Sequence, residues 1–348
     1  MTRNPYTRIR KPQTDDIAAQ LAQRIVGQTD AIQAITPYVQ LFQAGLSPEG
    51  RPVGVFLLLG PTGTGKTRTV EALADVIHGS ERNVLRIDCG EFQLEHEVAK
   101  LIGAPPGYLG HRETHPLLTQ GKLNGVTSER SGLSIVLFDE IEKAAPSMTR
   151  LLLGVLDKAS LRLGDNTNVN FERSLIFLTS NLGAGEMMKQ MLAGFGFGGC
   201  MPRTGPVDSG KLHAIAGHSI RRRFAPEFLN RIDQTITYRP LGRQELDSIL
   251  DLQLDILRMH IINRLGPRAF DLEVTPAARE HLITKGTSLE FGARELKRTI
   301  HRLVMQPLAA LVAQEQVPPA GLLRVNFSAK SSELVFDAYP TRRRLDAA

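Results

Sequence analysis

The chain has 348 residues, 42% of them hydrophobic and 22% charged, the composition of an ordinary globular protein with room for about two domains. Its 2 cysteines exclude a disulfide framework and favour a reducing cytosol. No stretch approaches the roughly 20 apolar residues of a membrane span, and the basic N-terminus lacks the apolar segment of a secretory signal. The net charge of +6 comes partly from two arginine triplets, which we interpret as solvated surface rather than as a nucleic-acid contact.

Apolar runs alternate with helical patterns through the first two thirds of the chain. The runs are Val55–Leu59, Val84–Ile87, Ile135–Phe138, Leu175–Thr179 and Thr235–Tyr238. Strands that are separated by helices predict a parallel sheet covered on both faces. We therefore expect an α/β domain with αβα layers.

The pattern changes after Tyr238 and indicates a smaller, mainly helical domain. Three helices are predicted: Gln244–Leu265, a second that begins at Thr275-Pro276 and ends at Gly286, and a third from near Ala293 towards Val312. The segments Leu322–Phe327 and Glu333–Phe336 predict a closing β-hairpin. We expect an N-terminal extension at 1–22, a large domain at 23–238, a small domain at 239–338 and a basic tail at 339–348.

One stretch of the chain has the sequence that a phosphate-binding loop requires. It consists of Gly60, Pro61, Thr62, Gly63, Thr64, Gly65, Lys66 and Thr67, and it lies between a predicted buried strand and a predicted helix. Glycines allow successive N–H groups to point at phosphate oxygens, and the helix N-terminus adds partial positive charge. Lys66 is expected to contact the β- and γ-phosphates, Thr67 to ligate Mg²⁺, and Arg68 to lie beside them. The stretch predicts nucleoside triphosphate binding.

Two further strands end in polar residues suited to hydrolysis. Ile135–Phe138 is followed by Asp139, expected to hold Mg²⁺ directly or through water, and by Glu140, expected to polarise the water that attacks the γ-phosphate. Asn181 follows the next strand and is expected to help orient that water, although a turn or capping role is the alternative. The guanine-reading pattern Asn-Lys-x-Asp is absent from the sequence, which favours ATP.

These motifs, in this order, resemble the AAA+ ATPases of the Clp unfoldase and disaggregase group, and most of all the second ATPase module of ClpB, ClpA and ClpC. The resemblance extends over about residues 22 to 325. Besides the phosphate loop, it rests on Ile25–Gln28, Leu101–Gly110, Asp139–Ala144, Pro226–Asp233 and Gly292–Arg294. It implies an AAA+ nucleotide domain with a helical lid domain, here as a single module.

The resemblance also implies roles for four further residues. Val26 is expected to pack on the adenine, and Arg294 to contact the nucleotide from the lid domain. Arg231 is expected to act as an arginine finger on a neighbouring subunit's γ-phosphate, since it has no evident partner within its own motif; an ion pair with Asp233 or Glu227 is the alternative. Tyr108, on a glycine-flanked loop, is expected to grip polypeptide in a central pore.

A Gly- and Pro-rich segment, Leu192–Ser209, is predicted to be a long mobile loop. Within it, Phe195-Gly196-Phe197 resembles the tripeptide by which ClpA and ClpC dock on the ClpP peptidase. Aromatic anchors on such a loop suit small hydrophobic pockets. The alternatives are a loop folded back on its own domain and a contact for a different partner.

The sequence therefore predicts an ATP hydrolase that forms a homo-hexamer in the cytoplasm and threads unfolded or tagged proteins through its pore. Two alternatives remain open at this point. One is a remodelling or loading AAA+ ATPase that acts on a folded partner or a nucleic-acid complex without threading. The other is a nucleotide-binding regulator with weak turnover, against which the complete set of acid, finger and sensor residues argues.

Overall fold

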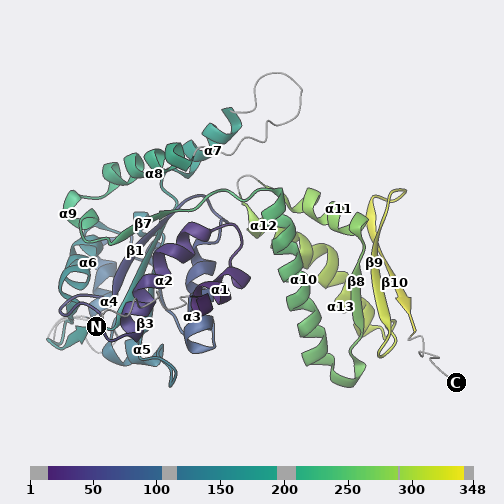
Figure 1. Cartoon of the computed structure of the whole chain (residues 1–348), viewed down its shortest axis with the longest axis horizontal. Coiled ribbons are helices and arrows are strands. Elements are labelled where there is room, and N and C mark those ends of the chain that lie inside the picture. Colours follow the sequence, from purple (N-terminus) through teal and green to yellow (C-terminus); the bar gives the residue numbers. More distant parts are fainter. Residues whose placement is uncertain (1–14, 104–115, 194–208, 289–290, 341–348) are drawn as a thin grey trace, which may run out of the picture. The chain divides into compact units, whose positions relative to one another are not determined.

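The computed structural model describes residues 15–103, 116–193, 209–288 and 291–340 (Figure 1). It divides into two compact units: the first ends at Arg239, and the second comprises the chain from Pro240 onward together with Thr62–Thr64. In the part of the chain that is described, no helix combines the length and the apolar character needed to cross a membrane. Each unit has its own hydrophobic core.

The first unit is built on a parallel sheet of 5 strands in the order β2-β3-β6-β1-β7. The strands are β1 (Gly54–Leu59), β2 (Leu85–Asp88), β3 (Ser134–Asp139), β6 (Ser174–Ser180) and β7 (Gln234–Thr237). Every residue of β1, β3 and β6 is buried, as expected for central strands covered on both faces. The predicted parallel α/β fold is confirmed.

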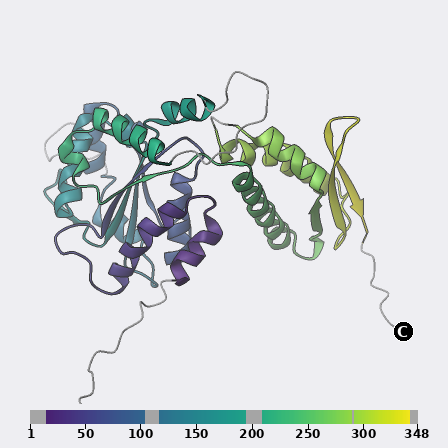
Figure 2. The ribbon, with the colours of Figure 1, turned by 45° about the horizontal axis from the view of Figure 1, so that its top comes forward.

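Helices cover both faces of this sheet (Figure 2). Successive residues of its central strands belong to opposite clusters of the core. Phe56 and Leu58 pack on one side, with α1 (Asp15–Arg24), α2 (Thr29–Gln43) and α3 (Lys66–His78). Val55 and Leu57 pack on the other side. The helices of that layer include α6 (Pro146–Lys158), α7 (Ala184–Ala193), α8 (Ser209–Arg223) and α9 (Pro226–Leu229). Alternation with a period of two therefore fills both layers from the same strands.

Several shorter elements of the first unit were not predicted. They are α4 (Ala99–Ile102), α5 (Gln120–Gly125) and an antiparallel hairpin of β4 (Ser160–Arg162) and β5 (Asn168–Asn170). Each hairpin strand has three residues, of which only the central one is buried. Segments of this length have too little apolar alternation to be distinguished from a loop.

The second unit packs helices on a sheet of 3 strands in the order β10-β9-β8. Its helices are α10 (Arg243–Leu265), α11 (Pro276–Gly286), α12 (Ala293–Ile300) and α13 (Gln306–Ala313). The predicted hairpin is present as β9 (Leu322–Ser328) and β10 (Glu333–Tyr339). The sequence analysis missed β8 (Asp271–Val274), which pairs in parallel with β9 and contributes only two buried side chains.

Ion pairs join α10 to α11 outside the core of the second unit. Arg279 of α11 contacts the carboxylates of Asp251 at 2.5 Å and of Asp247 at 3.1 Å, both on α10. The hydrogen bond from Arg279 holds the pKa of the Asp251 carboxyl below its ordinary value. These charges lie at the surface, so they orient the two helices more than they stabilise the fold.

A single π-helical turn, His301–Met305, interrupts the predicted third helix and separates α12 from α13. Pro307 follows this turn and has no N–H, so it cannot donate to the carbonyl of Leu303 as an α-helix would require. A local widening of the helix accommodates the missing bond.

The start of α11 provides a test of the second unit's stability. The Thr275 hydroxyl accepts a hydrogen bond from the Ala278 N–H and so caps the helix. Thr275→Ala should lower the free energy of unfolding by about 1 kcal/mol, while Thr275→Ser should retain most of it. Denaturant unfolding with hydrogen exchange at the Ala278 amide measures this. Equal protection of that amide in both variants would show that the cap is not stabilising.

Candidate nucleotide-hydrolysis site

The phosphate loop, Asp139, Glu140 and Asn181 lie at one edge of the sheet of the first unit. β1 ends at the phosphate loop, β3 ends at Asp139, and β6 is followed by Asn181. These strands are adjacent and parallel, so their carboxyl ends meet at the same edge. Ligands of open α/β sheets bind at such an edge.

The phosphate loop has a backbone that only glycine adopts readily at three positions. The φ angles are 143° at Gly60, 76° at Gly63 and 104° at Gly65. A Cβ atom at Gly60 would lie 2.7 Å from the carbonyl oxygen of Tyr238, so a side chain is excluded there by contact as well as by conformation. Gly65 directly precedes α3, so the loop leads into a helix N-terminus, where the first N–H groups have no acceptor within the helix itself. The loop therefore has the conformation and the helix start of an anion site.

The Lys66 side chain is buried and held by the loop that precedes it. Its ammonium donates to the carbonyl oxygens of Gly60 at 2.7 Å and Pro61 at 2.9 Å, and to Oδ1 of Asn181 at 2.9 Å. These partners fix the charge between the loop and the end of β6. Oxygens of a triphosphate are stronger acceptors for the same donors, because they are ionised.

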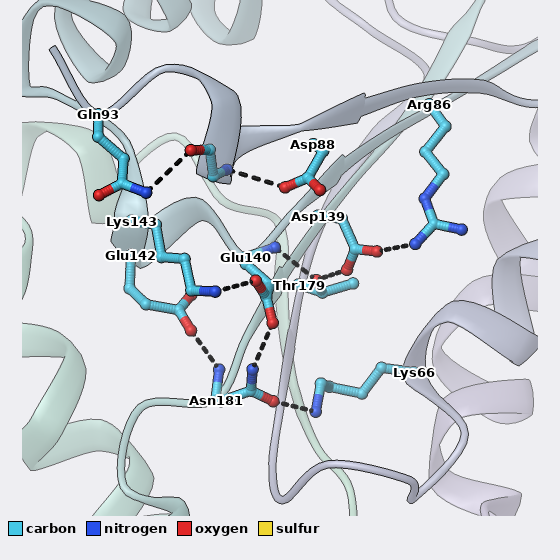
Figure 3. Close-up of polar contacts among 11 residues, drawn as sticks. Lys66, Arg86, Asp88, Gln93, Asp139, Glu140, Glu142, Lys143, Thr179 and Asn181 are labelled. Carbon is cyan, nitrogen blue, oxygen red and sulfur yellow. Dashed lines mark hydrogen bonds and ion pairs between the residues drawn. The ribbon is translucent and has the colours of Figure 1, made fainter. Parts of the chain in front are cut away.

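Asp139 and Glu140 are tied to the neighbouring strand by the hydroxyl of Thr179 (Figure 3). This hydroxyl donates to Asp139 Oδ1 at 2.5 Å and accepts from the Glu140 N–H at 3.0 Å. The other Asp139 oxygen pairs with Arg86 of β2. Glu140 itself has a left-handed φ of 57°, which turns its side chain away from the strand direction.

The Glu140 carboxylate lies between an ammonium and an amide (Figure 3). Lys143 contacts one oxygen at 2.5 Å, and the Asn181 Nδ2 donates to the other at 3.3 Å. The hydrogen bond to Glu140 raises the pKa of Lys143 above its ordinary value. Lys66, Asn181 and Glu140 thus form one continuous polar series, with Asn181 as its central member.

The structure corrects one expectation for Arg231. Its guanidinium does have a partner within its own motif, because Nη1 donates to the carbonyl oxygen of Glu227 at 2.6 Å. It also lies 3.5 Å from a carboxylate oxygen of Asp157 on α6. The expected alternative partner, Asp233, instead contacts Arg51 and the N–H of Val55. No described interaction joins Arg231 to the phosphate loop or to Glu140 of its own chain.

The remaining predicted site residues are more dispersed. Arg68 on α3 pairs with Glu81 at 2.6 Å, and Thr67 is the second residue of the same helix. Val26 is half-buried beside Gln28, whose amide donates to the backbone of Arg239. Arg294 is exposed on α12 of the second unit, and its contact with nucleotide stays a prediction. Tyr108 and Phe195-Gly196-Phe197 lie outside the described residues.

The donor set suits Mg²⁺ that is shared with a nucleotide. The Thr67 hydroxyl and the Asp139 carboxylate are the oxygen ligands that Mg²⁺ prefers. In the described ranges, no group of three or more His, Cys, Asp and Glu could hold a metal ion by itself. Mg²⁺ is usually bound by one or two protein oxygens together with phosphates and water, so the residues fit this ion.

Sequence reasoning missed three members of the site. Thr179 and Arg86 were overlooked because only strand register brings them to Asp139. Lys143 lies three residues after Glu140, a spacing that could have indicated their ion pair. Thr179 lies one residue before the last residue of β6, and a hydroxyl at that position does not by itself indicate a site.

A parallel αβα sheet with a phosphate loop, an acid strand and a polar residue on the adjacent strand defines a P-loop nucleotide hydrolase. The family model described as "AAA domain (Cdc48 subfamily)" matches residues 51–235. The model described as "C-terminal, D2-small domain, of ClpB protein" matches residues 241–325. The chain therefore belongs to the AAA family of ATP hydrolases, as a Clp-type module with its own small domain, and the resemblance stated from the sequence is confirmed.

Among curated proteins, the chaperone protein ClpB of Meiothermus ruber is 37% identical over 322 residues, covering 92% of this chain and 35% of ClpB. The ATP-dependent Clp protease ATP-binding subunit ClpC of Staphylococcus saprophyticus is 36% identical over 311 residues, covering 88% of this chain and 36% of ClpC. A closed-state cryoEM reconstruction of Hsp104 with ATPγS and FITC casein matches with a TM-score of 0.76 at 27% identity, over 93% of this chain and 51% of that one. The chain spans about a third of the length of these curated relatives.

Replacing Thr179 tests how the acid residues are positioned. Thr179→Val keeps the shape of the side chain but removes both hydrogen bonds, so kcat for ATP should fall roughly 10- to 100-fold. Thr179→Ser retains the hydroxyl and should remain close to wild type. Addition of Mg²⁺ should increase the affinity for a fluorescent ATP analogue less in Thr179→Val than in the other two proteins, because Asp139 is then held by Arg86 alone. Equal turnover and equal Mg²⁺ dependence of the two variants would contradict this role.

Proposed function

We propose that the chain is the ATP-hydrolysing module of a protein unfoldase or translocase, which hydrolyses ATP at subunit interfaces of a ring and moves polypeptide through its centre. The observation that supports it most is the series Lys66–Asn181–Glu140, which connects the phosphate loop to the catalytic acid. Membership of the Clp-type AAA family supports the protein substrate.

In the proposed reaction, the phosphate loop binds the triphosphate of ATP, and Lys66 neutralises its β- and γ-phosphates. Mg²⁺, bound through Thr67 and Asp139, would supply charge neutralisation of the transferred phosphoryl group. Glu140 accepts a proton from the attacking water as a general base. Lys143 and Asn181 keep its carboxylate oriented, and the amide of Asn181 remains within reach of both Glu140 and Lys66.

The arginine finger is proposed to act on the next subunit. Arg231 is half-buried, follows the short helix α9, and pairs with Asp157 at a distance typical of a weak surface contact. A partner of this kind is readily exchanged for a phosphate, which binds a guanidinium through two hydrogen bonds. A finger supplied by a neighbour stabilises the charge of the transition state and makes hydrolysis depend on ring assembly.

We further propose that the substrate is a polypeptide. The reconstruction of Hsp104 to which this chain is similar includes ATPγS and FITC casein, which is a protein. Tyr108 is proposed as the pore residue that contacts polypeptide in a homo-hexamer. The competing possibility is a remodelling ATPase that acts on a folded partner without threading, for which ATP turnover would not depend on Tyr108.

Docking of a ClpP-type peptidase stays a prediction from Phe195-Gly196-Phe197. The relatives differ on this point, since one is the ATP-binding subunit of a Clp protease and another is a chaperone. A stand-alone unfoldase is therefore equally compatible with the family.

Glu140→Gln should bind ATP normally but lose turnover by roughly two orders of magnitude or more, because a positioned base contributes about 10²–10⁴. Lys66→Ala should instead lose ATP binding. Equilibrium binding of a fluorescent ATP analogue together with steady-state hydrolysis separates the two defects. Wild-type turnover by Glu140→Gln would refute the assignment of the base.

Arg231→Ala should assemble and bind ATP yet hydrolyse it poorly, because the missing charge belongs to a neighbour's site. Mixing Arg231→Ala with Glu140→Gln subunits should restore part of the activity, since some interfaces then pair an intact finger with an intact base. Analytical ultracentrifugation and turnover of the mixtures measure this. Full activity of a protein that is monomeric at every concentration would rule out the interface mechanism.

A further inference from the structure

The last residue of α8, Arg223, is hydrogen-bonded to the segment that follows the catalytic acid. Its Nε donates to the carbonyl oxygen of Glu142 at 3.0 Å, and its Nη2 donates to the same oxygen at 2.7 Å and to that of Ala144 at 3.0 Å. The planar guanidinium thereby joins two main-chain carbonyls of one turn. A point charge such as an ammonium cannot reproduce this arrangement, because it lacks the fixed fork of donors.

The turn held by Arg223 also determines where Asn181 lies. Glu142 accepts a hydrogen bond from the Asn181 N–H at 2.9 Å through its side-chain Oε1. The main chain of Glu142 is thus bound by Arg223 while its side chain binds Asn181. A shift of Asn181 on γ-phosphate binding or release would therefore be felt at Arg223 through a single intervening residue.

On its other side, Arg223 is continuous with the segment that bears Arg231. Phe224 is buried and stacks on Phe228 with ring centroids 5.2 Å apart. The Arg231 N–H donates to the Phe228 carbonyl at 3.2 Å, and its side chain donates to Glu227. Residues 224–231 are thus packed as one body, anchored to the acid turn by Arg223.

We propose that Arg223 is a positioning residue that couples a subunit's own hydrolysis site to the arginine finger which the same subunit presents to its neighbour. This inference rests on the proposed function, since it requires Arg231 to act in a ring. In this proposal, release of the γ-phosphate held by Lys66 shifts Asn181, which is bonded to Lys66, and Glu142 moves with the Asn181 N–H. The Arg223 hydrogen bonds transmit the displacement to residues 224–231, and Arg231 moves with them. Hydrolysis at one site of the ring then depends on the state of the neighbouring site.

The adjacent Arg222 offers a matched control. It is exposed on the same turn of α8, and its side chain makes no hydrogen bond or ion pair with any other described residue. Arg222→Ala removes the same charge from the same helix end as Arg223→Ala. Differences between the two variants therefore report the contacts of Arg223, which are its hydrogen bonds to Glu142 and Ala144 and its cation–π contact with the Phe224 ring, rather than net charge.

The experiment measures ATP hydrolysis against ATP concentration for assembled wild type, Arg223→Ala, Arg223→Lys and Arg222→Ala. Arg223→Ala should lower kcat roughly 2- to 30-fold and abolish the sigmoidal ATP dependence, with unchanged equilibrium affinity for a fluorescent ATP analogue. Arg223→Lys keeps the charge and the stem, so it should fold like wild type and recover only part of the cooperativity. Arg222→Ala should behave as wild type.

Addition of Arg223→Ala to an Arg231→Ala background should change cooperativity no further, because both substitutions remove the same signal. If Arg223→Ala rings keep wild-type kcat and sigmoidal kinetics, the coupling is overturned while the proposed function remains intact. Arg223→Lys rings serve for the same comparison if the alanine variant does not fold. A wild type that is monomeric and hyperbolic in ATP would overturn the proposed function and the coupling together.

Discussion

The candidate site depends on one constraint, the placement of the Asn181 amide between the Lys66 ammonium and the Glu140 carboxylate. A carboxylate and an ammonium at the edge of a closely packed sheet would each lose solvation without a polar partner. The amide bonds to both, since its oxygen accepts from Lys66 and its nitrogen donates to Glu140. The Asn181 amide thereby lies between the Lys66 ammonium and the Glu140 carboxylate. In the proposed reaction, Lys66 can then contact phosphate while Glu140 contacts water.

Burial of the central sheet is what makes this placement accurate. β1, β3 and β6 are buried along their whole length, so their ends are fixed by packing on both faces rather than by surface loops. Polar residues occur only where these strands emerge. The same packing continues through Phe224 and Phe228, so the segment bearing Arg231 belongs to the core of the same unit.

The central strands and the phosphate loop could be predicted because their signals are local: apolar runs, and a glycine pattern followed by lysine. Thr179 and Arg86 could not, because their contacts with Asp139 depend on register. Phe138 pairs with Leu178, which brings Asp139 beside Thr179, and no feature of either strand's sequence specifies that alignment. Arg223 was noticed only as part of a basic triplet, since its partners are carbonyl oxygens that any sequence possesses.

The left-handed conformation of Glu140 links the stability of the protein to its activity at a single position. A non-glycine residue in this region costs on the order of 1 kcal/mol or more relative to glycine, and the surrounding contacts must offset that cost. The contacts of the Glu140 carboxylate with Lys143 and Asn181 contribute to that offset, so glycine here would relieve the backbone cost but would remove these contacts and the base together. A residue chosen here for its backbone preference alone would leave the site without its base, so the conformation of this position is set by function and not by local backbone stability.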